Sequence, residues 1–185
     1  MITRKTHLTA VVLIPPEAVW EPIQRIRRLY DRQFHRWMPH VCLLYPFLPP
    51  EGLGSAAERL GRICGEVTPF EVSFSEVRAF HHSPSSGTIW LAPHPKERLT
   101  HLQAVLQEAY PDCDELSGFR DGFTPHLSLG QTRSAPALDS ILGEVRASWT
   151  PLAFRVDRIA LIRRQASKPF EVTHWIPIGA TGPQG

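Results

Sequence analysis

The stretch Pro39-His40-Val41-Cys42-Leu43 has a counterpart at Pro125-His126-Leu127-Ser128-Leu129. In each, a histidine is followed by an aliphatic residue, a small polar side chain and a leucine. Residues two apart in a β-strand point to the same face of a sheet. Each stretch is therefore predicted to be a strand that presents its histidine and its thiol or hydroxyl on one face, while its aliphatic side chains point into a core.

Two histidines that meet across a cleft are suited to proton transfer. The unperturbed pKa of histidine lies near neutrality, so one ring can accept a proton while the other donates one. A neighbouring thiol or hydroxyl can donate a hydrogen bond to a bound anion. We therefore interpret His40 and His126 as candidate catalytic residues, with Cys42 and Ser128 as candidate substrate contacts. The sequence leaves open which histidine is the base and which the acid.

The same residues allow three other interpretations. The two histidines can be ordinary strand residues that hydrogen-bond at a sheet edge. His40, Cys42 and His126 carry atoms that bind zinc, but no carboxylate or fourth ligand lies at a useful spacing, so no metal is expected. Cys42 can act as a nucleophile only if its pKa is lowered, and no helix N-terminus is evident beside it. No cofactor is expected.

The order of predicted elements around the two stretches is also repeated. A strand and a helix precede each histidine, over 8–14 and 17–30 in the first case and over 88–92 and 96–110 in the second. The two histidines are too far apart in sequence to share one local loop. We therefore expect two similar lobes that face each other, with the histidine strands lining a shared cleft.

The expected fold class is α+β: bilobal, with two antiparallel-rich sheets related by pseudo-twofold symmetry, helices on the outer faces and a central cleft. Residues 1–178 are expected to form one domain of two interleaved lobes, and 179–185 a flexible tail. The other predicted elements are helices over 55–67 and 136–149, strands over 70–74 (continuing over 77–80), 154–162 and 170–177, a loop over 112–122, and a polar turn over 81–87 that includes His81 and His82.

Length and composition narrow the class of protein. A chain of 185 residues with a formal net charge of +2 is mildly basic, well short of the dense positive face of a protein that binds duplex DNA. Three widely spaced cysteines argue against a disulfide framework and predict a reducing compartment, the cytoplasm or a nucleus. The apolar run over 8–14 is too short for a signal peptide or a membrane span. We expect a cytoplasmic monomer without membrane contact.

Two segments of the form His-x-Ser/Thr-hydrophobic, separated by most of a domain, resemble the signature of the 2H phosphoesterase superfamily, which includes bacterial RNA 2′,3′-cyclic phosphodiesterases once described as 2′-5′ RNA ligases. The resemblance extends over nearly the whole chain. It implies metal-independent cleavage of a cyclic or 2′,5′-linked phosphodiester, with His40 and His126 transferring protons and Ser128 donating to the phosphate. Cys42 departs from the pattern, because the family has Thr or Ser there and a thiol is a weaker donor.

Other residues near the two segments are candidate substrate contacts. Tyr45 and Phe47 follow the first segment and Phe123 precedes the second, so each can stack on a nucleobase, although packing in the core is an equal possibility. Arg164 and Lys168 lie near predicted strand ends, where a phosphate can be reached, although such residues often face solvent. The five tryptophans are expected to fill the core or an interface.

The expected partner is an RNA end or a small cyclic nucleotide, and the expected activity is hydrolysis of a 2′,3′-cyclic phosphate or a 2′,5′ linkage. A different class of function, a non-catalytic RNA- or nucleotide-binding module on the same scaffold, gains support from the departure at Cys42. Ligation through a 2′,5′ linkage is the same chemistry in reverse. The natural substrate, the RNA length and the bond left in the product are not specified by the sequence.

Overall fold

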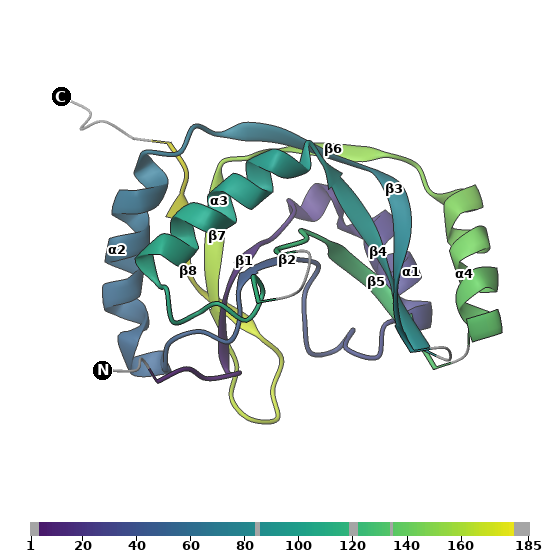
Figure 1. Ribbon diagram of the computed structural model, residues 1–185, viewed down its shortest axis with the longest axis horizontal. Helices are drawn as coiled ribbons and strands as arrows, with labels where there is room; N and C mark the ends of the chain where they lie inside the picture. Colours follow the sequence, from purple (N-terminus) through teal and green to yellow (C-terminus); the bar gives the residue numbers. More distant parts are fainter. Residues whose placement is uncertain (1–3, 84–85, 119–121, 134, 180–185) are drawn as a thin grey trace.

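The structure, a computed structural model, describes residues 4–83, 86–118, 122–133 and 135–179. Within them the chain forms one antiparallel sheet with the strand order β6-β3-β4-β5-β2-β1-β7-β8 (Figure 1). The strands are β1 (Thr9–Leu13), β2 (Val41–Leu44), β3 (Phe70–Ser83), β4 (Ser86–His94), β5 (Leu127–Thr132), β6 (Leu152–Val156), β7 (Arg158–Arg163) and β8 (Glu171–Pro177). The helices are α1 (Trp20–Tyr30), α2 (Leu53–Gly65), α3 (Lys96–Ala109) and α4 (Ala135–Ser148), with short 3-10 turns at Glu17–Val19 and Pro50–Gly52. The expected α+β class is confirmed.

The sheet consists of two halves of four strands that meet at its centre. The first half is β2-β1-β7-β8 and the second half is β6-β3-β4-β5. They join through one residue pair, Val41 with Leu127. The two expected sheets are thus halves of one continuous sheet, and the two histidine strands are the strands that meet. On each side of this pair, the histidine strand lies next to the strand that precedes it in the chain, β1 beside β2 and β4 beside β5. The pseudo-twofold symmetry itself remains a prediction.

Two helices cross from one half of the sheet to the other. α1 follows β1 of the first half but packs on β5 of the second, and α3 follows β4 of the second half but packs on β2 of the first. The remaining two stay at the ends of the sheet, with α2 against β8 and α4 against β3 and β4 (Figure 1). The two halves are therefore interleaved through their helices.

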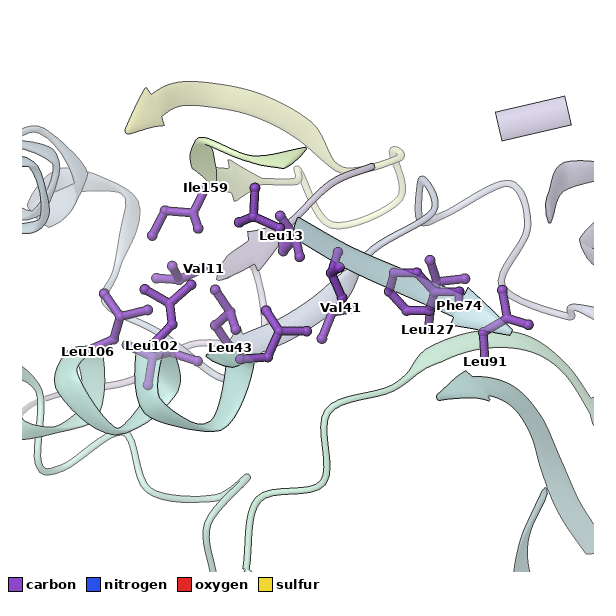
Figure 2. Close-up of a cluster of buried hydrophobic side chains, with 14 of the residues drawn as sticks. Val11, Leu13, Val41, Leu43, Phe74, Leu91, Leu102, Leu106, Leu127 and Ile159 are labelled. Carbon is purple, nitrogen blue, oxygen red and sulfur yellow. The ribbon is translucent and has the colours of Figure 1, made fainter. Parts of the chain in front are cut away.

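The larger of two hydrophobic clusters lies between the helices and one face of the sheet. Leu99, Leu102 and Leu106 recur at the spacing of one helical face in α3, and all three are fully buried. Figure 2 shows Leu102 and Leu106 beside strand residues of the first half. The same cluster includes buried residues of every α-helix and the alternate residues of the central strands: Val11, Leu13, Ile23, Ile26, Val41, Leu43, Leu60, Leu127, Leu129, Leu138 and Val145.

Gly130 marks the point where α1 rests on β5. A Cβ atom built on Gly130 would lie 2.4 Å from the Cβ of Tyr30 and 2.9 Å from its backbone. Real Cβ atoms do not approach so closely, so only glycine admits α1 at this distance. This contact fixes the helix of one half against the histidine strand of the other.

The predicted single strand over 154–162 is wrong. The chain there forms β6 and β7, which are separated by Asp157. β6 pairs with β3 in the second half, whereas β7 pairs with β1 in the first. The run of apolar residues continues through both strands and does not reveal that the chain changes partner, because both strands bury side chains in the same core.

Two further predictions concern the hairpin of the second half and the C-terminal residues. The polar turn predicted over 81–87 is shorter than expected, because β3 continues through His81 and His82 to Ser83 and β4 begins at Ser86. Of the predicted tail, residues 180–185 lie outside the described residues, and Gly179 donates its N–H to the carbonyl of Cys64. No helix in the described part of the chain is both long and apolar enough to cross a bilayer.

Candidate active site

The two strands that join the halves bring the four candidate residues of the repeated segments together. β2 and β5 are antiparallel and pair through the residues that directly follow the two histidines. Continued by one residue in each direction, this register sets His40 opposite Ser128 and Cys42 opposite His126. Directly opposite residues have Cβ atoms about 4.5–5.5 Å apart. The four half-buried side chains thus form two cross-strand pairs on one face.

Both histidine rings are held in the same way. His40 Nδ1 lies 2.7 Å from the carbonyl oxygen of Met38, and His126 Nδ1 lies 2.8 Å from that of Thr124. Because a carbonyl oxygen only accepts, Nδ1 carries the proton and donates in both cases. This leaves Nε2 of each ring with a free lone pair. In both cases the carbonyl belongs to the residue two positions before the histidine.

Aromatic rings support each histidine from the side. His40 stacks on Trp37, with ring centroids 4.5 Å apart and an interplanar angle of 17°. His126 meets Phe80 edge to face at 5.1 Å and lies 5.9 Å from Trp90. The sequence predicts that the tryptophans fill the core or an interface, and it does not single out Phe80. Phe80 alternates along β3 with residues that point into the core, so the sequence could have placed it on the face of the histidines. This inference requires the register between β3 and β4, which the sequence does not give.

Burial sets the protonation of both rings. It lowers the pKa of His40 to about 4, and the nearby charges of Arg27 and His126 act in the same direction. The hydrogen bond to Met38 opposes this effect. The pKa of His126 is also lowered, again mainly by burial, against the hydrogen bond to Thr124. At neutral pH His40 is therefore an uncharged ring whose Nε2 can take a proton.

The Cys42 side chain is a neutral thiol. Burial raises its pKa to about 12. Nucleophilic attack and zinc binding both require the thiolate, so this environment disfavours both alternatives for Cys42. Among the described residues, moreover, no three His, Cys, Asp or Glu side chains gather as a metal site requires. What Cys42 retains is a weak S–H donor beside His126.

Behind His40 lies a buried ion pair that the sequence did not predict. The side chain of Arg27 in α1 is 2% exposed and bonds to Asp31 at 2.8 Å. A second nitrogen of the guanidinium donates to the carbonyl oxygen of Trp37 at 2.8 Å. Arg27 therefore ties α1 to the segment whose ring and carbonyl groups hold His40. We interpret Arg27 as a positioning residue.

The residues after the first segment fall on opposite sides of the sheet. Tyr45 is half-buried and meets Trp37 edge to face at 5.3 Å, so it lies beside the candidate site. The predicted contact by Phe47 is wrong. Phe47 is fully buried in the core against Tyr110, with ring centroids 5.0 Å apart, and cannot reach a substrate. The backbone of Phe47 pairs with Thr6 in an isolated bridge.

The two basic candidates differ in their surroundings. Arg164 is half-buried and sits over the ring of Phe170 at 5.5 Å, and its charge acts on Tyr45. It therefore lies near the first-half side of the site. Lys168 is exposed on the segment between β7 and β8, and no contact within the described residues brings it to the histidines. Arg164 remains a candidate substrate contact. Within the described residues, no contact supports this role for Lys168.

A cavity of about 850 Å³ adjoins His126 on the second half. Two residues of its wall, Trp90 and Arg78, share a face with Ser128, because Ser128 pairs with Trp90 and Trp90 pairs with Arg78. Phe123, the third candidate for base stacking, also lines this cavity. The complete lining is Ser75, Glu76, Arg78, Trp90, Ala92, Pro93, His94, Lys96, Glu97, Thr100, His101, Ala104, Phe123, Thr124 and Pro125.

Known proteins are similar to this chain in sequence and in fold. The sequence profile of the 2′-5′ RNA ligase superfamily matches residues 15–168. A protein of Oceanobacillus iheyensis named "putative phosphoesterase" is 24% identical over 170 residues, which cover 91% of this chain and 96% of that protein.

Solved structures extend the comparison to the whole fold. A Thermus thermophilus protein is 19% identical with a TM-score of 0.61, covering 95% of this chain and 100% of its own. Escherichia coli LigT, solved with phosphate, is 14% identical with a TM-score of 0.58, covering 96% and 100%. LigT solved with 3′-AMP is 15% identical with a TM-score of 0.59, covering 94% and 99%. At these identities the structural likeness establishes the fold.

Proposed function

Because this chain belongs to the 2′-5′ RNA ligase superfamily, we propose that it is a phosphodiesterase that hydrolyses 2′,3′-cyclic phosphate or 2′,5′-linked ends of RNA and related nucleotides by two-histidine acid/base catalysis. The family and the relative named as a phosphoesterase support phosphoesterase chemistry in general. One observation carries the specific proposal. Both histidines hold Nδ1 on a carbonyl and leave Nε2 free, on one face and across one strand pair.

The proposed reaction divides the proton transfers between the two rings. Nε2 of His40, uncharged at neutral pH, takes a proton from water, and the water oxygen forms a bond to phosphorus. The bond from phosphorus to one ribose oxygen breaks, and that oxygen receives the proton of Nε2–H from a protonated His126. The bound phosphate anion favours this protonated form, against the effect of burial. Each transfer contributes about 10²–10⁴-fold to such a reaction.

The small side chains opposite the histidines orient the phosphate in this proposal. The Ser128 hydroxyl, across from His40, donates to a non-bridging phosphate oxygen. Cys42, across from His126, offers the weaker S–H. LigT, which shares this fold, has been solved with phosphate and with 3′-AMP, which supports a phosphate-containing ligand here. The proposed chemistry needs no metal, since both proton carriers are side chains of the chain itself.

The test is turnover of 2′,3′-cyclic AMP in excess EDTA by the wild type, His40→Ala, His126→Ala and the matched control His81→Ala. His81 is an exposed histidine of β3, so its removal leaves the pair intact. We expect losses of about 10²–10⁴-fold in kcat for the first two variants and none for the control. Equal turnover by all four proteins, or loss of wild-type turnover in EDTA, would contradict the proposal.

A second candidate function is a nucleotide- or RNA-binding module without catalysis. The observation that favours it is the thiol of Cys42 at a position where the resemblance implies a hydroxyl. Titration calorimetry with 3′-AMP beside the turnover assay separates the two. Binding by the wild type without hydrolysis of the cyclic substrate favours the module, whereas hydrolysis that both histidine variants lose favours the enzyme.

A further inference from the structure

We propose that Gln131 and Asp31 are positioning residues for the ring of His40. They tie β5, the histidine strand of the second half, to the segment that carries Trp37, on which the His40 ring stacks. This inference rests on the proposed function, because it assigns to the same site two residues that act through other side chains. The repeated segments contain neither of them.

Gln131 uses both groups of its side-chain amide to join β5 to the end of α1. Its Nε2 donates to Oδ1 of Asp31 at 3.1 Å, and its Oε1 accepts from the backbone N–H of Arg32 at 3.2 Å. Asp31 directly follows α1, whereas Gln131 lies in β5, the strand that follows His126. One side chain thus connects the strand of one histidine with the segment that leads to the other, His40.

Asp31 extends this connection to the aromatic ring beside His40. Its Oδ2 accepts from Nε of Arg27 at 2.8 Å, and another nitrogen of Arg27 donates to the carbonyl oxygen of Trp37 at 2.8 Å. The ring of Trp37 stacks on His40, with centroids 4.5 Å apart. A continuous chain of contacts therefore runs from Gln131 to the reacting ring.

The carboxylate of Asp31 is buried, and each of its oxygens has a donor. Its side chain is 3% exposed and that of Arg27 is 2% exposed. Oδ1 accepts from Gln131 and from the backbone N–H of Gln33 at 2.8 Å, while Oδ2 accepts from Arg27. Hydrogen bonds to a buried charge are stronger than those between neutral groups, and the loss of one is costly. Removal of the Gln131 amide therefore weakens the network where it reaches β5.

The segment over 31–38 consists of turns, so its position depends on contacts with its neighbours. On the side of the first half, the carbonyl oxygen of Arg36 accepts from the N–H of Phe170 at 2.8 Å, and the ring of Phe170 lies 3.9 Å from that of Trp37. Gln131 supplies a contact on the side of the second half. It therefore sets the segment, and the histidine ring stacked on it, against the strand of the other histidine.

The surroundings of His40 give its position a measurable signature. Burial is the main reason that the pKa of His40 is lowered to about 4. The charges of Arg27 and His126 lower this pKa further, whereas the hydrogen bond to Met38 and the charge of Asp31 raise it. A segment that moves away from β5 admits water to the ring. The pKa of His40 should then return toward its ordinary value of 6.5.

The experiment removes the amide of Gln131 and follows the ring of His40. Gln131 is half-buried, and Gln131→Met keeps the length of the side chain but makes neither hydrogen bond. Thr9→Val is the matched control, because Thr9 is fully buried in β1, outside the network, and donates to the carbonyl oxygen of Leu48 at 2.6 Å. Both variants lose hydrogen bonds of one side chain, so both should be less stable than the wild type.

Two measurements follow the ring. NMR titration of the histidine side chains, with His40 assigned from His40→Gln, gives its pKa without any need for turnover. We expect this pKa to move from about 4 toward 6.5 in Gln131→Met and to stay unchanged in Thr9→Val. On 2′,3′-cyclic AMP, kcat per folded molecule should fall about 10-fold in Gln131→Met, with KM within about twofold of the wild type, because a displaced base slows the reaction more than it weakens binding.

The outcomes separate this inference from the proposed function. The same His40 pKa in Gln131→Met and the wild type, or a kcat that falls no more than in Thr9→Val, would overturn the positioning role and leave the proposed function standing. A wild type that does not hydrolyse the cyclic substrate would overturn the proposed function. The titration of His40 would still decide whether Gln131 holds the ring in place.

Discussion

Replacing Cys42 by serine exchanges the weakest donor of the site for a stronger one. The register places this side chain opposite His126, on the face where Ser128 is expected to donate to phosphate. Its pKa of about 12 keeps it protonated, so it acts through S–H and not through a charge. A hydroxyl donates more strongly than a thiol. Cys42→Ser should therefore strengthen a contact to the phosphate that already exists in the wild type.

The size of the effect follows from the net value of one hydrogen bond. Such a bond contributes about 0.5–1.5 kcal/mol, and about 1 kcal/mol corresponds to roughly fivefold in kcat/KM. We expect Cys42→Ser to be equal to the wild type or up to about fivefold faster on 2′,3′-cyclic AMP at pH 7. Cys42→Ala, which donates nothing, should be slower than the wild type by a similar factor.

The assay needs a control for folding, because a hydroxyl in a half-buried position can cost stability. Urea denaturation of each variant gives the folded fraction under assay conditions. Cys113→Ser is the matched control, since Cys113 is buried and stands outside the repeated segments. It should lose stability without a change in kcat/KM per folded molecule. A serine variant slower than the alanine variant, or identical rates in all three proteins, would refute the contact.

Two further predictions concern stability. The folded pKa of His40, about 4, lies below its unfolded value of 6.5, so its contribution to stability is complete above pH 6.5 and is lost as the pH falls toward 4. Urea denaturation at several pH values should show that the free energy of unfolding falls by on the order of 2–3 kcal/mol more in the wild type than in His40→Gln across that window. An equal fall in both proteins would exclude this effect. Arg27→Met should lower the free energy of unfolding by about 3–5 kcal/mol in the same assay, because Asp31 stays buried without its charged partner. The double variant Arg27→Met/Asp31→Leu should recover most of this loss. If it recovers none, the ion pair is not the cause.

The repeated segments predicted the centre of the molecule because strand alternation is a local property. His40 and Cys42 share a face whatever their partners are, and the same holds for His126 and Ser128. The order of elements likewise predicted that each histidine strand follows a strand and a helix. The sequence therefore contained both the α+β class and the four side chains that the structure brings together.

Other features depend on partners that no local pattern encodes. Between β1 and β2 the register shifts, so that Val12 pairs with Cys42 but Val11 pairs with Leu44. This β-bulge leaves Leu43 without a direct partner and buries it together with Leu44. Simple alternation would place Leu44 on the histidine face. The position of Tyr45 beside Trp37 is a consequence of this one extra residue.

The surroundings of Arg27 and Asp157 were also not predictable from local sequence patterns. Arg27 has the residue type of a solvated helix face, and its burial is explained by acceptors that the sequence pattern does not show: the carboxylate of Asp31, the carbonyl of Trp37 and the side-chain oxygen of Gln24. Asp157 interrupts an apolar run where the chain passes from the second half of the sheet to the first. Both depend on which surfaces meet after the chain has folded.

The exchange of helices between the halves makes each half depend on the other for its own core. Without α1, which precedes the first histidine, β5 would expose the surface around Gly130; without α3, which precedes the second, β2 would lose its cover. Neither set of four strands can separate with its core intact, so we expect the molecule to unfold and refold as one cooperative unit. The spacing between the two imidazoles is therefore maintained by the stability of the whole molecule, and local unfolding of one half alone cannot change it.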